Sequence, residues 1–366
     1  MSGGVVERAR RGAGRGRVAA GVVGGIVGLA AAGVAAGVAG QRALLRRHKQ
    51  STEPDPHLEE AFGELIADEY RTVHTAEGIP LHVEISGPKW ARTTVVFVHG
   101  FCLDMGTFHF QRTALTRVDG IRAVFYDQPG HGRSGRLPAG EYTLDMLALA
   151  LRKVIEECAA PDSRVVLVGH SMGGMAIMAL AELAPDLFTP EGRVSRVALI
   201  SSSAGGVTFG LPELVVRFRG GRLLPLISGA GTVTAGMLDR ARAASKDIAW
   251  LLTRKFGFGT TAASAALVSY VEQMNGATPS ESVARYLCAL YGHACDPGVS
   301  GLKRIPVLVI SGDMDQVIPV AHSRDLIREL PRAELVIIPN AGHVALLEQS
   351  EAVNAVLFPF IRKIGA

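Results

Sequence analysis

Short runs of β-branched and aromatic residues alternate with helical stretches along most of the chain, and this alternation restricts the fold most. Residues 94–99 are TVVFVH, and residues 164–169 are RVVLVG. Continuous apolar runs of this length are typical of parallel strands buried on both faces. Strands that alternate with helices predict an α/β fold with a mostly parallel, eight-stranded sheet between two helical layers. The expected strands are residues 70–74, 81–85, 94–99, 122–126, 164–169, 194–201, 306–311 and 333–338.

A glycine-rich turn, GHSMGG at residues 169–174, joins one of these strands to an apolar helix expected at residues 172–183. In a G-x-S-x-G turn between a strand and a helix, the serine lies above the end of the sheet. The N-terminus of the helix then lies beneath it and favours developing negative charge. The turn therefore predicts that Ser171 is a nucleophile.

A serine nucleophile needs a base, and His343 has the most suitable position among the eleven histidines. It follows the last expected strand and precedes a helix expected at residues 344–361, which places it at the same edge of the sheet as Ser171. An acid should orient this base and stabilise its charged form. Asp313 and Asp315 both follow the strand at residues 306–311. We favour Asp315, which lies deeper in the turn, and expect Asp313, which adjoins the strand end, to cap the turn.

Two backbone amides are expected to hold the negatively charged oxygen of a tetrahedral intermediate. One is the amide of Met172, directly after the serine, and the other is that of Phe101, which follows His99 and Gly100. Amides aimed at such an oxyanion stabilise the transition state. A second glycine-rich turn, DQPGHGRS at residues 127–134, lies at the same edge, and we interpret it as a scaffold turn.

Residues 205–300 interrupt the alternation and predict an inserted helical cap over the carboxyl edge of the sheet. Helical stretches are expected at residues 236–256, 262–274 and 280–291. Many apolar side chains in the cap favour an apolar acyl substrate, although they could instead only pack the cap onto the sheet. These residues are Leu211, Leu214, Val215, Val216, Phe218, Leu223, Leu224, Leu226, Ile227, Phe256 and Phe258.

The N-terminal segment predicts a membrane anchor. Residues 18–40 carry no charge and consist almost wholly of Ala, Gly and Val, and roughly 20 apolar residues suffice to span a bilayer as a helix. A cleaved signal peptide, which would give a secreted form, and a soluble tail remain alternatives. Basic residues flank both ends of the segment, so neither orientation is favoured. Residues 51–69 read as a polar linker.

The distribution of charge argues against a nucleic-acid partner. The chain has a net charge of +4, but residues 1–50 contribute +8, from nine Lys and Arg and one Glu, so the remainder carries −4. A mildly acidic body does not provide a phosphate-binding surface. The four cysteines show no C-x-x-C spacing and predict neither a zinc site nor a redox pair. A bridge between Cys288 and Cys295 remains open.

Taken together, these motifs resemble the α/β-hydrolase superfamily over residues 72–361, including the chain order serine, aspartate, histidine. The GHSMGG turn is similar to that of monoacylglycerol lipases and small-molecule esterases. Its combination with an N-terminal anchor resembles actinobacterial membrane-anchored hydrolases. The implied organisation is a basic, membrane-associated N-terminus at residues 1–50, the linker at 51–69, a hydrolase core at 70–204 and 301–366, and the cap at 205–300.

The resemblance implies a serine hydrolase that cleaves a small-molecule or lipid carboxylic ester through an acyl-enzyme, with no metal and no organic cofactor. Haloalkane dehalogenases and epoxide hydrolases of this fold use an aspartate where this chain has Ser171, so both are disfavoured. Cofactor-free haloperoxidases, carbon–carbon bond hydrolases and acyltransferases share the Ser/Asp/His set and remain alternatives. A non-catalytic binding protein is a further one. The sequence does not indicate the oligomeric state.

Overall fold

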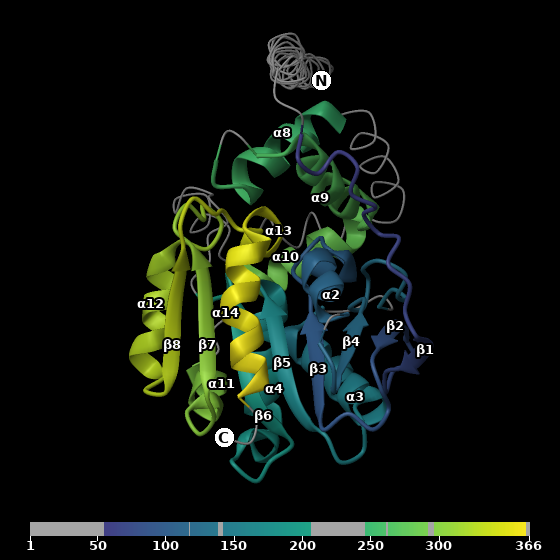
Figure 1. Cartoon of the computed structure of the whole chain (residues 1–366), viewed down its shortest axis with the longest axis vertical. Coiled ribbons are helices and arrows are strands. Elements are labelled where there is room, and N and C mark those ends of the chain that lie inside the picture. The colour runs from purple at the N-terminus through teal and green to yellow at the C-terminus, as the bar shows by residue number, and fades with distance from the viewer. Residues whose placement is uncertain are drawn as a thin grey trace, which may run out of the picture. The chain divides into compact units, whose positions relative to one another are not determined.

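An eight-stranded sheet forms the centre of the protein (Figure 1). The computed structural model describes residues 55–116, 118–137, 142–205, 246–260, 263–291 and 296–363. The strand order is β1-β2-β4-β3-β5-β6-β7-β8, with β2 antiparallel to both of its neighbours and all later pairings parallel. This confirms the predicted α/β fold with a mostly parallel sheet. The strands are β1 (Glu69–His74), β2 (Pro80–Ser86), β3 (Thr93–Val98), β4 (Ile121–Tyr126), β5 (Arg164–His170), β6 (Val194–Ile200), β7 (Val307–Gly312) and β8 (Ala333–Ile338).

Helices cover both faces of the sheet, which explains why its central strands are apolar on both sides. In β3, Val96 and Val98 belong to one hydrophobic core, and Val95 and Phe97 belong to the other. Each such fully buried side chain contributes roughly 1.5–3 kcal/mol. The first core lies under α3 (Leu144–Cys158), α4 (Met172–Leu183), α11 (Asp296–Leu302) and α12 (Val320–Glu329). The second lies under η1 (Met105–Phe108), α2 (His109–Leu115), α13 (Ala345–Glu348) and α14 (Ser350–Arg362).

The C-terminal helix differs from its prediction. The apolar spacing predicts one helix at residues 344–361, but the structure divides it into α13 and α14. Gln349 interrupts the helix with φ −126° and ψ 49°. At the break, the carboxylate of Glu348 turns to accept hydrogen bonds from loop amides, including that of Gly342. The single-helix prediction is therefore wrong, because a tertiary contact outweighs the local helical pattern.

The described part of the expected cap is helical, with α8 (Lys246–Gly257), α9 (Ala265–Ala277) and α10 (Ser280–Tyr291) grouped at one end of the sheet (Figure 1). The sequence did not lead us to expect α11. Of the apolar residues expected to line the cap, only Phe256 and Phe258 are described. Phe258 is buried in the second core, so it packs the cap onto the body. The other nine, between residues 211 and 227, lie outside the described residues.

The predicted membrane segment at residues 18–40 also lies outside the described residues. Within the part of the chain that the structure covers, no helix is both long and apolar enough to cross a membrane. The described end of the expected linker contacts the cap. Phe62 stacks on Tyr270 of α9 with ring centroids 4.4 Å apart, and Asp55 accepts a hydrogen bond from the Ser264 hydroxyl at 2.6 Å.

Candidate active site

Ser171 lies in a strained turn between β5 and α4. Its backbone has φ 53° and ψ −119°, a left-handed conformation that a non-glycine residue adopts only when its surroundings hold it there. The turn is held by the bond from the Ser171 amide to the Ile200 carbonyl, at 2.9 Å. It also requires glycine at residue 173, because a Cβ there would lie 2.0 Å from the Val98 carbonyl oxygen. The serine thus stands at the carboxyl end of the sheet and at the start of a helix.

The structure brings the three residues expected from the sequence into one hydrogen-bonded chain. Nε2 of His343 lies 3.0 Å from the Ser171 hydroxyl, and Nδ1 lies 2.9 Å from a carboxylate oxygen of Asp315. With the ring proton on Nδ1, His343 donates to Asp315 and leaves Nε2 to accept the serine proton. This is the geometry in which an imidazole can act as a general base.

Asp315 is fixed in the turn after β7. Its side chain is fully buried, and its second oxygen accepts the amides of Val317 and Ile318, both at 2.8 Å. Burial by itself would raise the pKa of Asp315, but the charge and hydrogen bond of His343 and the two amides outweigh it and hold the pKa below its usual value. Asp313 instead accepts the Ala341 amide at 3.3 Å, which ties β7 to the loop before His343.

The loop expected to supply an oxyanion donor lies beside the serine. A Cβ on Gly100 would come within 3.2 Å of the Ser171 Cβ and 2.8 Å of His170 Nδ1, so only glycine permits this approach. Phe101 follows directly. Met172, the other expected donor, is the first residue of α4 and is fully buried.

Two residues that the sequence analysis did not place in the site support His343. His170 is fully buried and donates from Nε2 to the His343 carbonyl at 2.9 Å. Burial and the neighbouring His343 lower the pKa of His170 to about 3, so its ring is neutral. Glu348 accepts the amide of Gly342, the residue before His343, at 2.7 Å. The position of His170 inside the GHSMGG turn was a usable signal, whereas nothing local to Glu348 marks it.

Within the described ranges, no group of three or more His, Cys, Asp or Glu side chains is arranged to hold a metal ion. The possible bridge between Cys288 and Cys295 falls outside what the structure describes, because the side chain of Cys288 and all of residue 295 are not covered.

Comparison with known proteins relates the chain to one family. The model of the alpha/beta hydrolase family matches residues 95–356, which is well over half of the chain. The dihydrolipoyllysine-residue acetyltransferase component of the acetoin cleaving system of Cupriavidus necator is 32% identical over 72% of this chain. The chain spans only 62% of the length of that relative.

Solved structures agree in fold. An esterase from Thermogutta terrifontis superimposes with a TM-score of 0.60 at 23% identity, over 81% of this chain and 100% of that one. An enol-lactonase from Burkholderia xenovorans LB400 gives a TM-score of 0.61 at 25% identity, over 80% of this chain and 99% of that one.

Proposed function

Because the chain belongs to the alpha/beta hydrolase family, we propose that it is a serine hydrolase that cleaves carboxylic esters with apolar acyl groups. The observation that carries the proposal is the hydrogen-bonded chain from Ser171 through His343 to Asp315. A buried carboxylate, an imidazole and a serine hydroxyl in this order are the parts needed to activate an alcohol as a nucleophile.

In the proposed reaction, the Ser171 hydroxyl oxygen attacks the ester carbonyl carbon as its proton passes to Nε2 of His343. Asp315 stabilises the imidazolium that forms. The amides of Phe101 and Met172 donate to the oxyanion, an interaction whose loss typically lowers kcat by about 10²–10³-fold. When the carbonyl reforms, the alcohol departs with the proton from His343, and water then releases the acid by the same steps in reverse.

The ester linkage is suggested by the esterases among the similar structures, and the preference for apolar acyl groups rests on the apolar residues of the expected cap. Each additional CH₂ that enters an apolar pocket contributes about 0.8 kcal/mol, or roughly fourfold in affinity. We expect kcat/KM on p-nitrophenyl esters to rise from acetate to medium chains. A steady decline beyond acetate would instead indicate a small or polar substrate.

An acyltransferase is the second candidate, and it is favoured by the 32% identity with an acetyltransferase component. The same acyl-enzyme would then pass its acyl group to an alcohol or thiol rather than to water. Product analysis in the presence of increasing acceptor separates the two activities. A hydrolase keeps releasing mostly free acid, whereas a transferase yields mainly the acylated acceptor.

Replacement of the serine tests the proposal directly. We expect Ser171→Ala to lower kcat on the order of 10⁶-fold and to abolish labelling by a fluorophosphonate probe, with the thermal unfolding midpoint unchanged. Ser269→Ala, on the exposed side of α9, is the matched control and should be labelled normally. A Ser171→Ala protein that retained turnover would refute the assignment of the nucleophile.

A further inference from the structure

The amide of Phe101 belongs to a peptide group whose other end is fixed by His99. The Gly100 carbonyl accepts from Nδ1 of His99 at 2.8 Å and from the Leu103 amide at 3.3 Å. A trans peptide is planar, with its N–H opposite its C=O, so the bonds that hold the Gly100 carbonyl also set the direction of the Phe101 amide. His99 is fixed in turn by Gln128, whose backbone amide donates to Nε2 at 2.8 Å.

The next peptide group is held by His131. The Cys102 amide donates to Nε2 of His131 at 3.3 Å, and Nδ1 of the same ring donates to the Pro129 carbonyl at 3.1 Å. Cys102 has φ 59°, a conformation that needs such support. His131 is 1% exposed. Its burial lowers the pKa of His131 to about 3, so Nε2 keeps the lone pair that accepts the Cys102 amide.

The cap reaches the same point through Tyr286 of α10. This fully buried side chain donates to the Pro129 carbonyl at 2.8 Å, and its ring centroid lies 5.2 Å from that of His131. Helix α10 packs closely on the turn, because a Cβ on Gly130 would lie only 2.9 Å from the Ser282 hydroxyl. Pro129 therefore joins a cap helix to the ring that holds the oxyanion loop.

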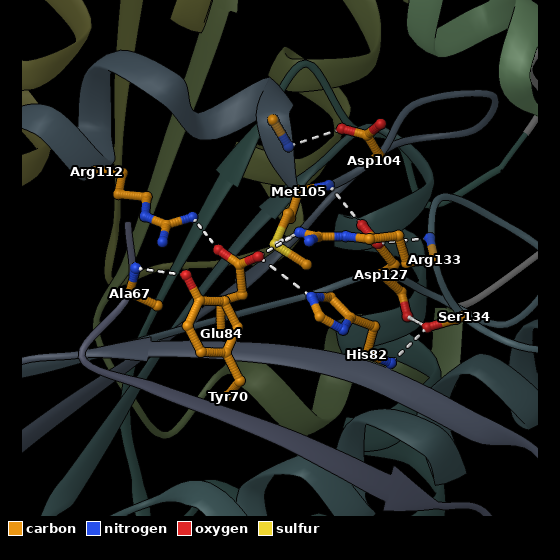
Figure 2. A network of polar contacts seen from close by, with 11 residues as sticks. Ala67, Tyr70, His82, Glu84, Asp104, Met105, Arg112, Asp127, Arg133 and Ser134 are labelled. Atoms are coloured by element: carbon orange, nitrogen blue, oxygen red, sulfur yellow. Dashed lines mark hydrogen bonds and ion pairs between the residues drawn. The ribbon is translucent and has the colours of Figure 1, made fainter. Parts of the chain in front are cut away.

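The opposite side of the turn is anchored to the sheet, as Figure 2 shows. Ser134 accepts the His82 amide of β2 at 2.9 Å and donates to the Asp127 carbonyl at 2.5 Å. The Asp127 carboxylate accepts the amides of Arg133 at 2.8 Å and Met105 at 2.9 Å. These bonds fix the turn to β2 on one side and, through the Met105 amide, to the end of the loop at residues 99–105 on the other.

We propose that the turn at residues 127–134 aligns the oxyanion donor, and that His131 and Tyr286 are positioning residues through which helix α10 sets the Phe101 amide. This inference rests on the function proposed above. It gives the cap an influence on the transition state that does not depend on contact with substrate.

Tyr286→Phe removes only the hydroxyl that joins α10 to the turn. We expect kcat for p-nitrophenyl esters to fall about fivefold with KM unchanged, because an oxyanion donor acts in the transition state and not on the bound ester. Tyr142→Phe is the matched control. Tyr142 is a buried neighbour of Tyr286, with ring centroids 4.7 Å apart, and its hydroxyl bonds to the Leu137 carbonyl and to Ser282 of α10. This variant therefore removes a hydroxyl contact with α10 but leaves the bond from Tyr286 to Pro129 in place. Its kcat should stay within twofold of wild type.

His131 allows a sharper pair of variants. In His131→Gln the amide oxygen can occupy the place of Nε2 and still accept the Cys102 amide. In His131→Asn the shorter side chain reaches only the place of Nδ1, so that acceptor is lost. We expect kcat to fall about thirtyfold in His131→Asn and no more than about threefold in His131→Gln, again with KM unchanged.

A trifluoromethyl ketone with a medium alkyl chain reports on the oxyanion site itself, because its adduct with the serine carries the same negative oxygen. Its inhibition constant should rise in each variant by the factor by which kcat/KM falls. Equal losses in the two His131 variants, or an unchanged inhibition constant beside a reduced kcat, would overturn the proposal while leaving the ester hydrolase intact. A wild-type protein without ester turnover or probe labelling would overturn the proposed function and this inference with it.

Discussion

The loop that carries His343 and the loop that carries Phe101 are each held by buried acceptors of backbone amides, but these acceptors differ in charge. On the His343 side, the carboxylate of Glu348 accepts the amides of Gly342 at 2.7 Å, Gly259 at 2.9 Å and Thr260 at 3.3 Å. On the Phe101 side, the neutral ring of His131 accepts the Cys102 amide of the loop, and the neutral ring of His99 accepts the Gln128 amide of the neighbouring turn.

Burial shifts the pKa values of these acceptors in opposite directions. It raises the pKa of Glu348, although the three amides partly compensate, and it lowers the pKa of His99 to about 4 and that of His131 to about 3. In each case burial disfavours the charged form. Burial therefore makes the ionised carboxylate of Glu348 less favourable at neutral pH. It opposes protonation of the two imidazoles only when the pH is acidic. The hydrogen bonds that hold the two loops are therefore expected to depend on pH in opposite ways.

The largest effect is expected on the His343 side, when the carboxylate that bonds to His343 is replaced. Asp315→Asn should lower kcat by about 10⁴-fold, the scale on which neutralising such an acid misorients the histidine. Asp313→Asn is the matched control and should change kcat by no more than about tenfold, since Asp313 only accepts the Ala341 amide. Steady-state kinetics on one p-nitrophenyl ester decides between them, and the reverse ranking would assign the acid to Asp313.

A smaller effect is expected from removing Glu348, which holds the loop that carries His343. Glu348→Ala leaves three amides without their acceptor, and each buried group left unsatisfied costs about 1–3 kcal/mol. We expect the free energy of unfolding to fall by about 3 kcal/mol and kcat to fall about tenfold, because His343 loses its fixed approach to Ser171. Glu351→Ala, on the exposed face of α14, should change neither. A fully active Glu348→Ala protein would show that the loop carrying His343 keeps its position without the hydrogen bonds of Glu348.

The opposite pKa shifts predict opposite pH dependences of stability. His131 binds a proton below about pH 6.5 only in the unfolded chain, so its contribution is complete above that pH and is lost as the pH falls toward 3. The folded pKa of Glu348 is raised, so the fold is less stable with Glu348 ionised than with it protonated, and this loss is relieved as the pH falls through that pKa.

Urea unfolding at pH 7.5 and pH 5 measures this contrast. The advantage of wild type over His131→Gln should shrink by about 2 kcal/mol at the lower pH, at about 1.4 kcal/mol per unit of pH. The advantage of wild type over Glu348→Gln should change in the other direction. Two differences of the same sign would contradict the comparison between the loops.

The smallest effect on catalysis is expected from deleting residues 1–50. The contacts that hold the two loops come from residues 82–348, and the truncation keeps Asp55 with its bond to Ser264, so kcat should stay within twofold. If residues 18–40 form the expected anchor, the full-length protein should sediment with membranes after a high-salt wash, and the truncated one should not. Release of the full-length protein by salt alone would assign binding to its arginines.

The sequence predicted those parts of the protein whose cause is local. The strands could be predicted because consecutive apolar residues such as Val95 and Val96 face opposite sides of a parallel sheet that is buried on both. The position of Ser171 could be predicted because its turn requires glycine at residue 173, where a Cβ would clash with the Val98 carbonyl, and this requirement is visible in the sequence. The order of Ser171, Asp315 and His343 along the chain then predicted three residues at one edge, and the structure places them within hydrogen-bonding distance.

Contacts between distant segments could not be predicted in this way. Glu348 looks like an ordinary residue of an amphipathic helix until residues 259–260 and 342 are brought beside it. The hydrogen bond from Tyr286 to Pro129 joins residues 157 positions apart, and nothing in either neighbourhood indicates the other. Phe62, placed by its sequence in a polar linker, stacks on Tyr270 for the same reason.

The order of strands in the sheet has a consequence for how the protein matures. Ser171 follows β5 near the centre, whereas Asp315 and His343 follow β7 and β8, which pair last along the chain at one edge. The pairing of β7 with β6 joins segments as far apart in the sequence as Val197 and Val307, and closing such a long-range pairing is slow compared with forming local structure. During synthesis the serine therefore emerges long before its base, as an ordinary alcohol that attacks nothing. Under the proposed function, Ser171 would become a nucleophile only after β7 and β8 have paired and brought Asp315 and His343 beside it, so labelling by a fluorophosphonate probe would also show that the sheet is complete.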